Sequence, residues 1–94
     1  MPAAVRFGDV CTGHDCFEQR PNISASTDVF INNLGAHRVG DAWSEHQCGR
    51  NRHSSVQASG SPNVFVNGIS LARIGDAIEC GSANATGSPN VFVN

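Results

Sequence analysis

Histidine and cysteine are the residues of this chain whose types and spacing could do chemistry, because three of them recur at nearly the same place in a sequence repeat. The repeat is marked by an Arg-x-Gly-Asp element, which begins at Arg6, Arg38 and Arg73. His14 and His46 lie eight residues after the arginine of their unit, and Cys80 lies seven residues after its own. If three units pack around a shared axis, these side chains meet near one point. Imidazole nitrogen and thiolate sulfur are donors with which proteins commonly bind zinc.

A fourth donor is available from His53, which lies in the loop of the second unit and is close enough in sequence to fold over the other three. Three histidines and one cysteine would form a closed tetrahedral zinc site. Iron is a less favoured occupant of the same donors. The competing interpretation, four unrelated surface side chains, does not explain why three of them share one phase of the repeat. The sequence therefore predicts a Zn²⁺ site made by His14, His46, His53 and Cys80.

The remaining cysteines are Cys11, Cys16 and Cys48, and the sequence leaves their roles open. Cys16 and Cys48 are equivalent in the repeat, since each lies two residues after a histidine. They could form a disulfide, ligate a metal or sit as small buried side chains. We favour a structural role over ligation.

Two further sets of polar residues occupy marked places in the repeat. His37 directly precedes Arg38, whereas the apolar residues Val5 and Ala72 precede the other two repeat arginines, so we expect a packing or surface role for it. The arginine and aspartate of each Arg-x-Gly-Asp element could be mistaken for a catalytic pair, but a turn explains them better. The aspartate can accept backbone N–H groups of the turn, and the arginine can bridge to a neighbouring unit.

The elements that must position these residues are short β-hairpins. An apolar run ending in asparagine recurs at residues 29–32, 64–67 and 91–94, each time after a turn-like tripeptide. Val-Phe-Val is typical of a short strand, and Asn67-Gly68 is a hairpin signal. Such hairpins cannot bury their apolar faces alone. We therefore predict an all-β, pseudo-threefold body of hairpins around a shared axis, with units that run 6–37, 38–72 and 73–94. A linear solenoid is the alternative, but three short units without caps would leave exposed strand edges.

Length and composition fit a small body of this kind. The 94 residues suffice for one domain, which we place at 1–94. Charged residues make up 15% of the chain, lysine is absent and the net charge is −2, which argues against nucleic acid as a partner. No apolar run reaches the roughly 20 residues of a membrane span, and the N-terminus lacks a signal-peptide pattern. Sequence signatures of zinc deaminases, P-loops and dinucleotide sites are missing, so we expect no catalytic residues and no enzyme activity.

The repeats resemble those of the PAAR-repeat family. The resemblance rests on Pro-Ala-Ala-Val-Arg at 2–6 and on Leu-Ala-Arg-Ile-Gly-Asp at 71–76, which alternates with Gly-Ser-Pro-Asn-Val-Phe-Val-Asn, and it covers essentially the whole chain. It implies a small cone that caps the homotrimeric β-helical spike of a contractile injection apparatus, a phage tail or a type VI secretion system, with one chain per trimer. It also implies a zinc at the tip, held here by His14, His46, His53 and Cys80.

The resemblance further implies where the protein works. It would be assembled in the bacterial cytoplasm, stand at the tip of a virion tail spike or of a secreted spike, and meet the target cell membrane transiently during puncture. We expect no fused toxin or effector, since the repeats fill the 94 residues. A function of a different class, a small free zinc-binding module or zinc enzyme, is the alternative.

Overall fold

The computed structural model describes all residues, 1–94, and contains six short strands and no helix. The strands form three separate two-stranded antiparallel sheets. These hairpins are β1 (Phe30–Ile31) with β2 (Leu34–Gly35), β3 (Ala42–Cys48) with β4 (Asn51–Val56), and β5 (Phe65–Val66) with β6 (Ile69–Ser70). The predicted all-β class is confirmed. No helix with the length and apolar character needed to cross a membrane is present.

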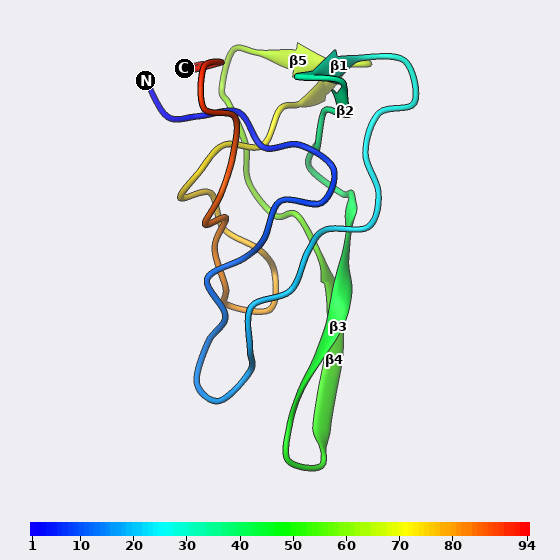
Figure 1. Cartoon of the computed structure of the whole chain (residues 1–94), viewed down its shortest axis with the longest axis vertical. Helices are drawn as coiled ribbons and strands as arrows, with labels where there is room; N and C mark the ends of the chain where they lie inside the picture. The colour runs from blue at the N-terminus through cyan, green and yellow to red at the C-terminus, as the bar shows by residue number, and fades with distance from the viewer.

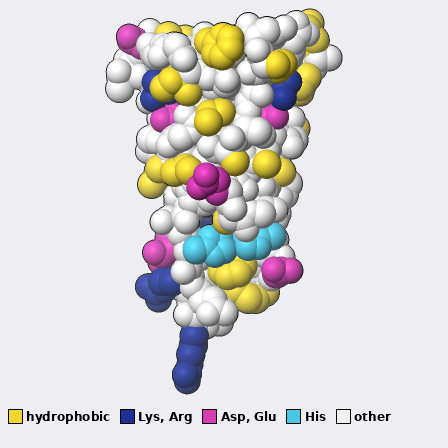
Figure 2. All heavy atoms as spheres, turned by 180° about the vertical axis from the view of Figure 1, so that it is seen from behind, with side chains coloured by type: hydrophobic (Ala, Val, Ile, Leu, Met, Phe, Trp, Pro, Cys, Tyr) yellow, Lys and Arg dark blue, Asp and Glu magenta, His cyan; other side chains and the backbone are white.

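The molecule is an elongated, tapering body with extents of 37 × 24 × 21 Å. Figure 1 shows β1, β2, β5 and both chain ends together at one end, which we call the base, and the β3–β4 hairpin running to the opposite end, the tip. Figure 2 shows the taper from behind, with histidine side chains gathered toward the tip. The predicted cone is confirmed, and a single longer hairpin forms its narrow end.

Two hairpins of the base close through two-residue turns with the same backbone shape. Asn32 and Asn33 join β1 to β2, and Asn67 and Gly68 join β5 to β6. All four residues have positive φ, from 54° at Asn32 to 76° at Gly68. Positive φ at both central residues is the geometry of a type I′ turn, which asparagine and glycine adopt most readily and which matches the twist of the flanking strands. The hairpin signal in Asn67-Gly68 is therefore confirmed.

A third hairpin of the base is assembled from the two ends of the chain. The Val93 N–H donates to Pro2 O at 3.0 Å, and the neighbouring Phe92 pairs antiparallel with Ala3. This repeats the pairing of β1 with β2 and of β5 with β6. The first and last residues of the chain, Met1 and Asn94, thus stand where the other hairpins have their turn residues, and Figure 1 shows the two ends close together at the base.

A closed ring of three backbone hydrogen bonds joins the units around the axis. The N–H of Val5 donates to Ala72 O at 3.0 Å, that of Ala72 to His37 O at 2.9 Å, and that of His37 to Val5 O at 3.0 Å. All three residues are fully buried, with 0% of their surface exposed. Each of the three residues that precede a repeat arginine donates one bond and accepts one, so the ring has the cyclic threefold order that the repeat predicted.

Each Arg-x-Gly-Asp element folds into the same turn, in which the aspartate accepts from the arginine three residues earlier. The arginine backbone N–H lies 2.8 Å from the aspartate Oδ2 in all three copies. The guanidinium binds the same carboxylate in every copy. Two of these groups also reach a neighbouring unit, since Arg6 donates to Gly87 O and Arg73 donates to Gly60 O, both at 3.3 Å. The structural interpretation of these residues is therefore confirmed.

Apolar side chains from the three units form two clusters along the axis. The cluster beneath the base hairpins consists of Ala4, Ile31, Ala36, Val66 and Leu71. The second cluster consists of Cys11, Trp43 and Ile78, each five residues after the arginine of its unit. Cys80 packs against this second cluster. The second cluster therefore forms an apolar floor under the histidines of the tip.

Candidate metal centre

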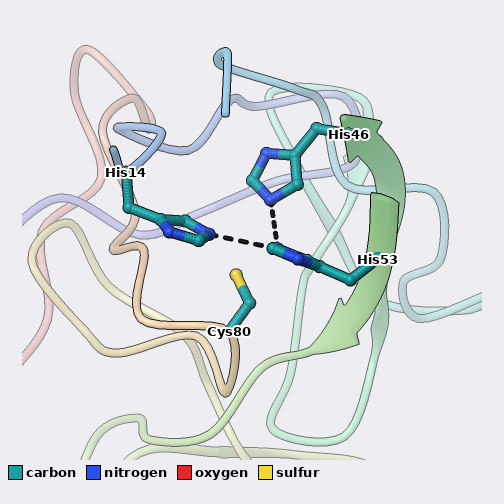
Figure 3. A group of neighbouring side chains, drawn as sticks. All are labelled: His14, His46, His53 and Cys80. Carbon is teal, nitrogen blue, oxygen red and sulfur yellow. Dashed lines mark hydrogen bonds between the residues drawn. The ribbon is translucent and has the colours of Figure 1, made fainter. Parts of the chain in front are cut away.

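Four side chains selected from the sequence come together near the tip. One donor atom from each of His14, His46, His53 and Cys80 lies within 4.8 Å of the other three. Figure 3 shows the group converging on one point, with His46 and His53 reaching in from the β3–β4 hairpin and His14 and Cys80 from separate segments. His46 is buried and the other three are partly buried. The group could hold a metal ion.

The β3–β4 hairpin places two of the four side chains, and it differs from the loop that the sequence predicted. Residues 51–56 form β4, so His53 is a strand residue that pairs directly with His46 across the hairpin. The register shifts between Trp43 and His46. Residues three apart on a regular strand face opposite sides, but this bulge turns both inward, with exposures of 3% and 4%. One strand therefore supplies both the core tryptophan and a histidine of the cluster.

The hydrogen bonds around His46 fix which of its nitrogens faces the cluster. Nδ1 lies 2.8 Å from the backbone oxygen of Glu18. A carbonyl oxygen can only accept, so Nδ1 carries the proton and Nε2 presents its lone pair to the cluster. A backbone carbonyl that holds the outer N–H of a histidine is a frequent support for a metal ligand. Glu18 follows His14 closely in the chain, so the segment that brings one histidine also orients another.

Phe17 covers the three histidines, and the sequence analysis missed it. Its ring centroid lies 4.8 Å from that of His14, 4.9 Å from that of His46 and 4.3 Å from that of His53. A tight turn sets this position, because the Phe17 N–H donates to His14 O at 2.7 Å and the His14 N–H donates back to Phe17 O at 3.1 Å. The repeat gives no signal for it, since the equivalent residues of the other units are Gly49 and Ala83.

The surroundings of His53 favour its neutral form. Desolvation is the main cause that lowers the pKa of His53 from its ordinary value of 6.5. The positive charges that His46 and His14 would carry lower it further. A histidine binds a metal only when one ring nitrogen is unprotonated. Desolvation, and to a smaller extent the neighbouring imidazoles, thus weaken proton binding at the ring nitrogens of His53.

The donor set fits one tetrahedral ion. Nitrogen ligands at about 2.0–2.1 Å from zinc lie about 3.3 Å from one another in a tetrahedron. His14 Nε2 and His53 Nε2 are 3.1 Å apart, and His46 Nε2 and His53 Nε2 are 2.5 Å apart. With His46 Nε2 unprotonated, a single N–H on His53 can satisfy only one of its two neighbours. A cation satisfies all three lone pairs at once, and the Cys80 thiolate would be the fourth donor.

The remaining histidine lies outside this cluster, on the threefold axis. His37 is fully buried, its Nδ1 donates to Ser24 O at 2.8 Å, and its ring packs edge-on against Trp43 at 5.1 Å between centroids. His37 Nε2 is buried with no hydrogen-bond partner. The packing role expected from the sequence is confirmed, and desolvation lowers the pKa of this histidine.

The structure also assigns the cysteines whose roles the sequence left open. Cys16 and Cys48 are joined in a disulfide, with their Cα atoms 5.3 Å apart. Cys11 is a free, buried residue of the apolar floor, and its Sγ accepts the Arg20 backbone N–H at 3.3 Å. Neither finding adds a donor to the cluster.

Comparison with known proteins is consistent with this geometry. The family model described as PAAR motif matches residues 8–85 of the 94, a range that contains all four side chains of the cluster. No curated protein sequence matches the chain.

Proposed function

This chain belongs to the PAAR motif family, a structural family associated with the spike tips of contractile injection systems, and we propose that it caps and sharpens such a spike. The spike would be a homotrimeric β-helix, and one chain would cover one trimer. The narrow end would lead during puncture of the target cell envelope, so its contact with a membrane is transient. The protein would be assembled in the bacterial cytoplasm and carried at the tip of a phage tail or of a secreted spike.

The observation that carries this proposal is the threefold order of the base. Phe30, Phe65 and Phe92 occupy the same place in the three base hairpins and are 60%, 56% and 50% exposed. Exposed aromatic side chains in a repeated arrangement are typical of a protein interface rather than of a free surface. A homotrimeric β-helix ends in three equivalent strand edges, which aggregate unless they are covered. A single chain with three equivalent hairpins can meet those edges one each.

A ring of side chains holds the three hairpins of the base at fixed spacing. The Ser26 hydroxyl donates to Asn67 Oδ1 at 2.7 Å, and the Ser88 hydroxyl donates to Asn32 Oδ1 at 2.6 Å. The Ser61 hydroxyl donates to the backbone oxygen of Asn94. Each contact runs from the turn before the apolar run of one unit to the asparagine at the end of the apolar run of another unit, so the ring closes after three steps. A rigid, symmetric base is what docking onto a rigid trimer requires.

We propose that the cluster at the tip binds Zn²⁺, with iron as the less favoured ion, through His14, His46, His53 and Cys80. The ion would tie the first, second and third units together near the tip. With four protein donors, zinc keeps no open position for a water molecule, so the site would be structural and not hydrolytic. The alternative of a free zinc enzyme requires such an open position.

The test of the proposed partnership is the mass of the complex with a homotrimeric β-helical spike protein from the same source. We expect one chain per trimer. The variant Phe65→Asp places a charge in the base and should abolish spike binding while zinc content is unchanged. Ile23→Asp is the matched control, because Ile23 is 55% exposed and its backbone N–H donates to Ala42 O, at the start of β3. Three chains per trimer, or equal spike binding by both variants, would contradict the proposal.

A further inference from the structure

The disulfide lies beside the candidate metal centre and connects two of the segments that form it. Cys16 lies two residues after His14, and Cys48 lies two residues after His46. Cys48 also ends β3, whose partner strand β4 carries His53. The bond therefore ties the segment of one histidine to the hairpin of two others. In the third unit the equivalent residue is Ser82, so the cross-link is confined to the two histidine-bearing units.

The segment 13–19, which we call the strap, has few other attachments. Its ends are fixed where the Thr12 N–H donates to Ala83 O at 2.8 Å and the Cys11 N–H donates to Arg20 O at 3.0 Å. Between these points none of its backbone N–H groups donates to an acceptor outside the strap. The strap nevertheless supplies His14, the Phe17 ring that covers the histidines and the Glu18 carbonyl that orients His46. Figure 3 shows His14 approaching from the side opposite the hairpin.

We propose that the Cys16–Cys48 disulfide is a redox-controlled latch on the metal centre, an inference that rests on the proposed metal site. Closed, it holds the strap against the β3–β4 hairpin and keeps the bound ion from leaving. Open, it leaves the strap attached to the hairpin through the Glu18 carbonyl hydrogen bond, the packing of Phe17 and the contact between His14 and His53. The strap can then move away with His14, which exposes the ion to competing ligands.

The chemistry of the latch is thiol–disulfide exchange. The Cys16 and Cys48 thiols together reduce one molecule of a disulfide oxidant, RSSR, so that one protein S–S bond forms and two RSH molecules leave with the two protons. Cys16 is exposed at the surface, where such an oxidant or a reducing thiol can reach it. Cytosolic thiols keep disulfides reduced, and extracellular and periplasmic conditions preserve them. The metal would therefore load while the latch is open and become trapped after export.

The experiment measures how fast the full chain, loaded with Zn²⁺, loses the ion to an excess of a chromogenic chelator. Three samples are compared: the oxidised protein, the protein reduced with a phosphine, which contributes no competing thiol, and the double variant C16S/C48S. We expect the reduced protein and the double variant to release zinc at equal rates, roughly 10- to 100-fold faster than the oxidised protein. That range is the usual effect on metal affinity of removing a group that supports a ligand. Glutathione disulfide should restore slow release in the reduced protein only.

Two readouts separate failure of the latch from failure of the metal site. The same three samples are loaded with Co²⁺, whose thiolate charge-transfer absorption reports the bond to Cys80. Absorption in all three samples with equal rates of zinc release would overturn the latch and leave the metal site intact. Absence of stoichiometric metal in the reduced protein after loading would overturn the metal site and the latch together. If the double variant does not fold, the oxidised and reduced forms of the unaltered chain still decide the question.

Discussion

The base and the tip of this molecule are stabilised in different ways. The base repeats itself: three hairpins, three Arg-x-Gly-Asp turns and a ring of three backbone bonds each use the same contacts once per unit. The tip does not: one unit alone has the long β3–β4 hairpin, and one pair of units shares the disulfide. Symmetry is kept where we propose a symmetric partner, and it is lost where the molecule narrows to one point.

Removing the proposed metal should have the largest effect, because the stability of the tip should depend on the ion and that of the base should not. For Cys80→Ser we expect loss of zinc and a fall in Tm of about 10 °C or more. Structural zinc in finger peptides is bound with about 10–16 kcal/mol of apparent free energy. Each kcal/mol lost moves Tm by roughly 4–8 °C in a domain of this size. Thermal unfolding with metal analysis measures both. Glu79→Gln, a change at the exposed neighbouring residue, is the control and should leave both unchanged. Full thermal stability of the Cys80 variant would mean that the cluster is not a structural site.

A second prediction concerns pH and the axis between base and tip. Burial lowers the pKa of His37, so the unfolded chain takes up a proton at a higher pH than the folded protein does. His37 therefore does not reduce the free energy of unfolding above about pH 6.5. As the pH falls from there toward the folded-state pKa of His37, the free energy of unfolding decreases by up to about 1.4 kcal/mol per pH unit.

Urea unfolding of the unaltered chain and of His37→Val at pH 7 and pH 5.5 isolates this effect. Valine is a suitable replacement because Val5 precedes Arg6 as His37 precedes Arg38. The histidines of the metal centre are the same in both proteins, so their contribution cancels in the difference. We expect a smaller loss of stability on acidification in the variant, and equal losses in the two proteins would refute the assignment.

The smallest of the predicted effects concerns the two asparagines of the turn between β1 and β2. Asn32 and Asn33 both have positive φ, but only Asn32 uses its side chain, accepting from Ser88 and Arg6 and donating to Asn90. Alanine at either position adds similar backbone strain. We therefore expect Asn32→Ala to lower the free energy of unfolding by about 1–2 kcal/mol more than Asn33→Ala, because it removes three side-chain hydrogen bonds, two of them exposed. Equal effects would show that the side-chain ring adds nothing to the base, and zinc content should not change in either variant.

The sequence predicted the features that repeat and missed those that do not. The phase of His14, His46 and Cys80 relative to the Arg-x-Gly-Asp turns was visible because three copies could be compared. The strand that carries His53 is polar on both faces and gives no alternating pattern, so the sequence predicts a loop there. The bulge that turns His46 inward depends on pairing with that strand, and the cover formed by Phe17 depends on a turn present in one unit. Tertiary contacts that occur once leave no periodic trace.

The hairpin formed by the two chain ends has a consequence for how the fold could be cut and rejoined. Val93 pairs with Pro2 as Ile31 pairs with Leu34, so a peptide bond from Asn94 to Met1 would complete a third two-residue turn. The base would then be a continuous ring with no first or last unit. New ends opened at the turn of Asn67 and Gly68 would give a circular permutant with the same cyclic order of contacts. Which unit comes first in the chain is thus a property of its connectivity and not of its architecture.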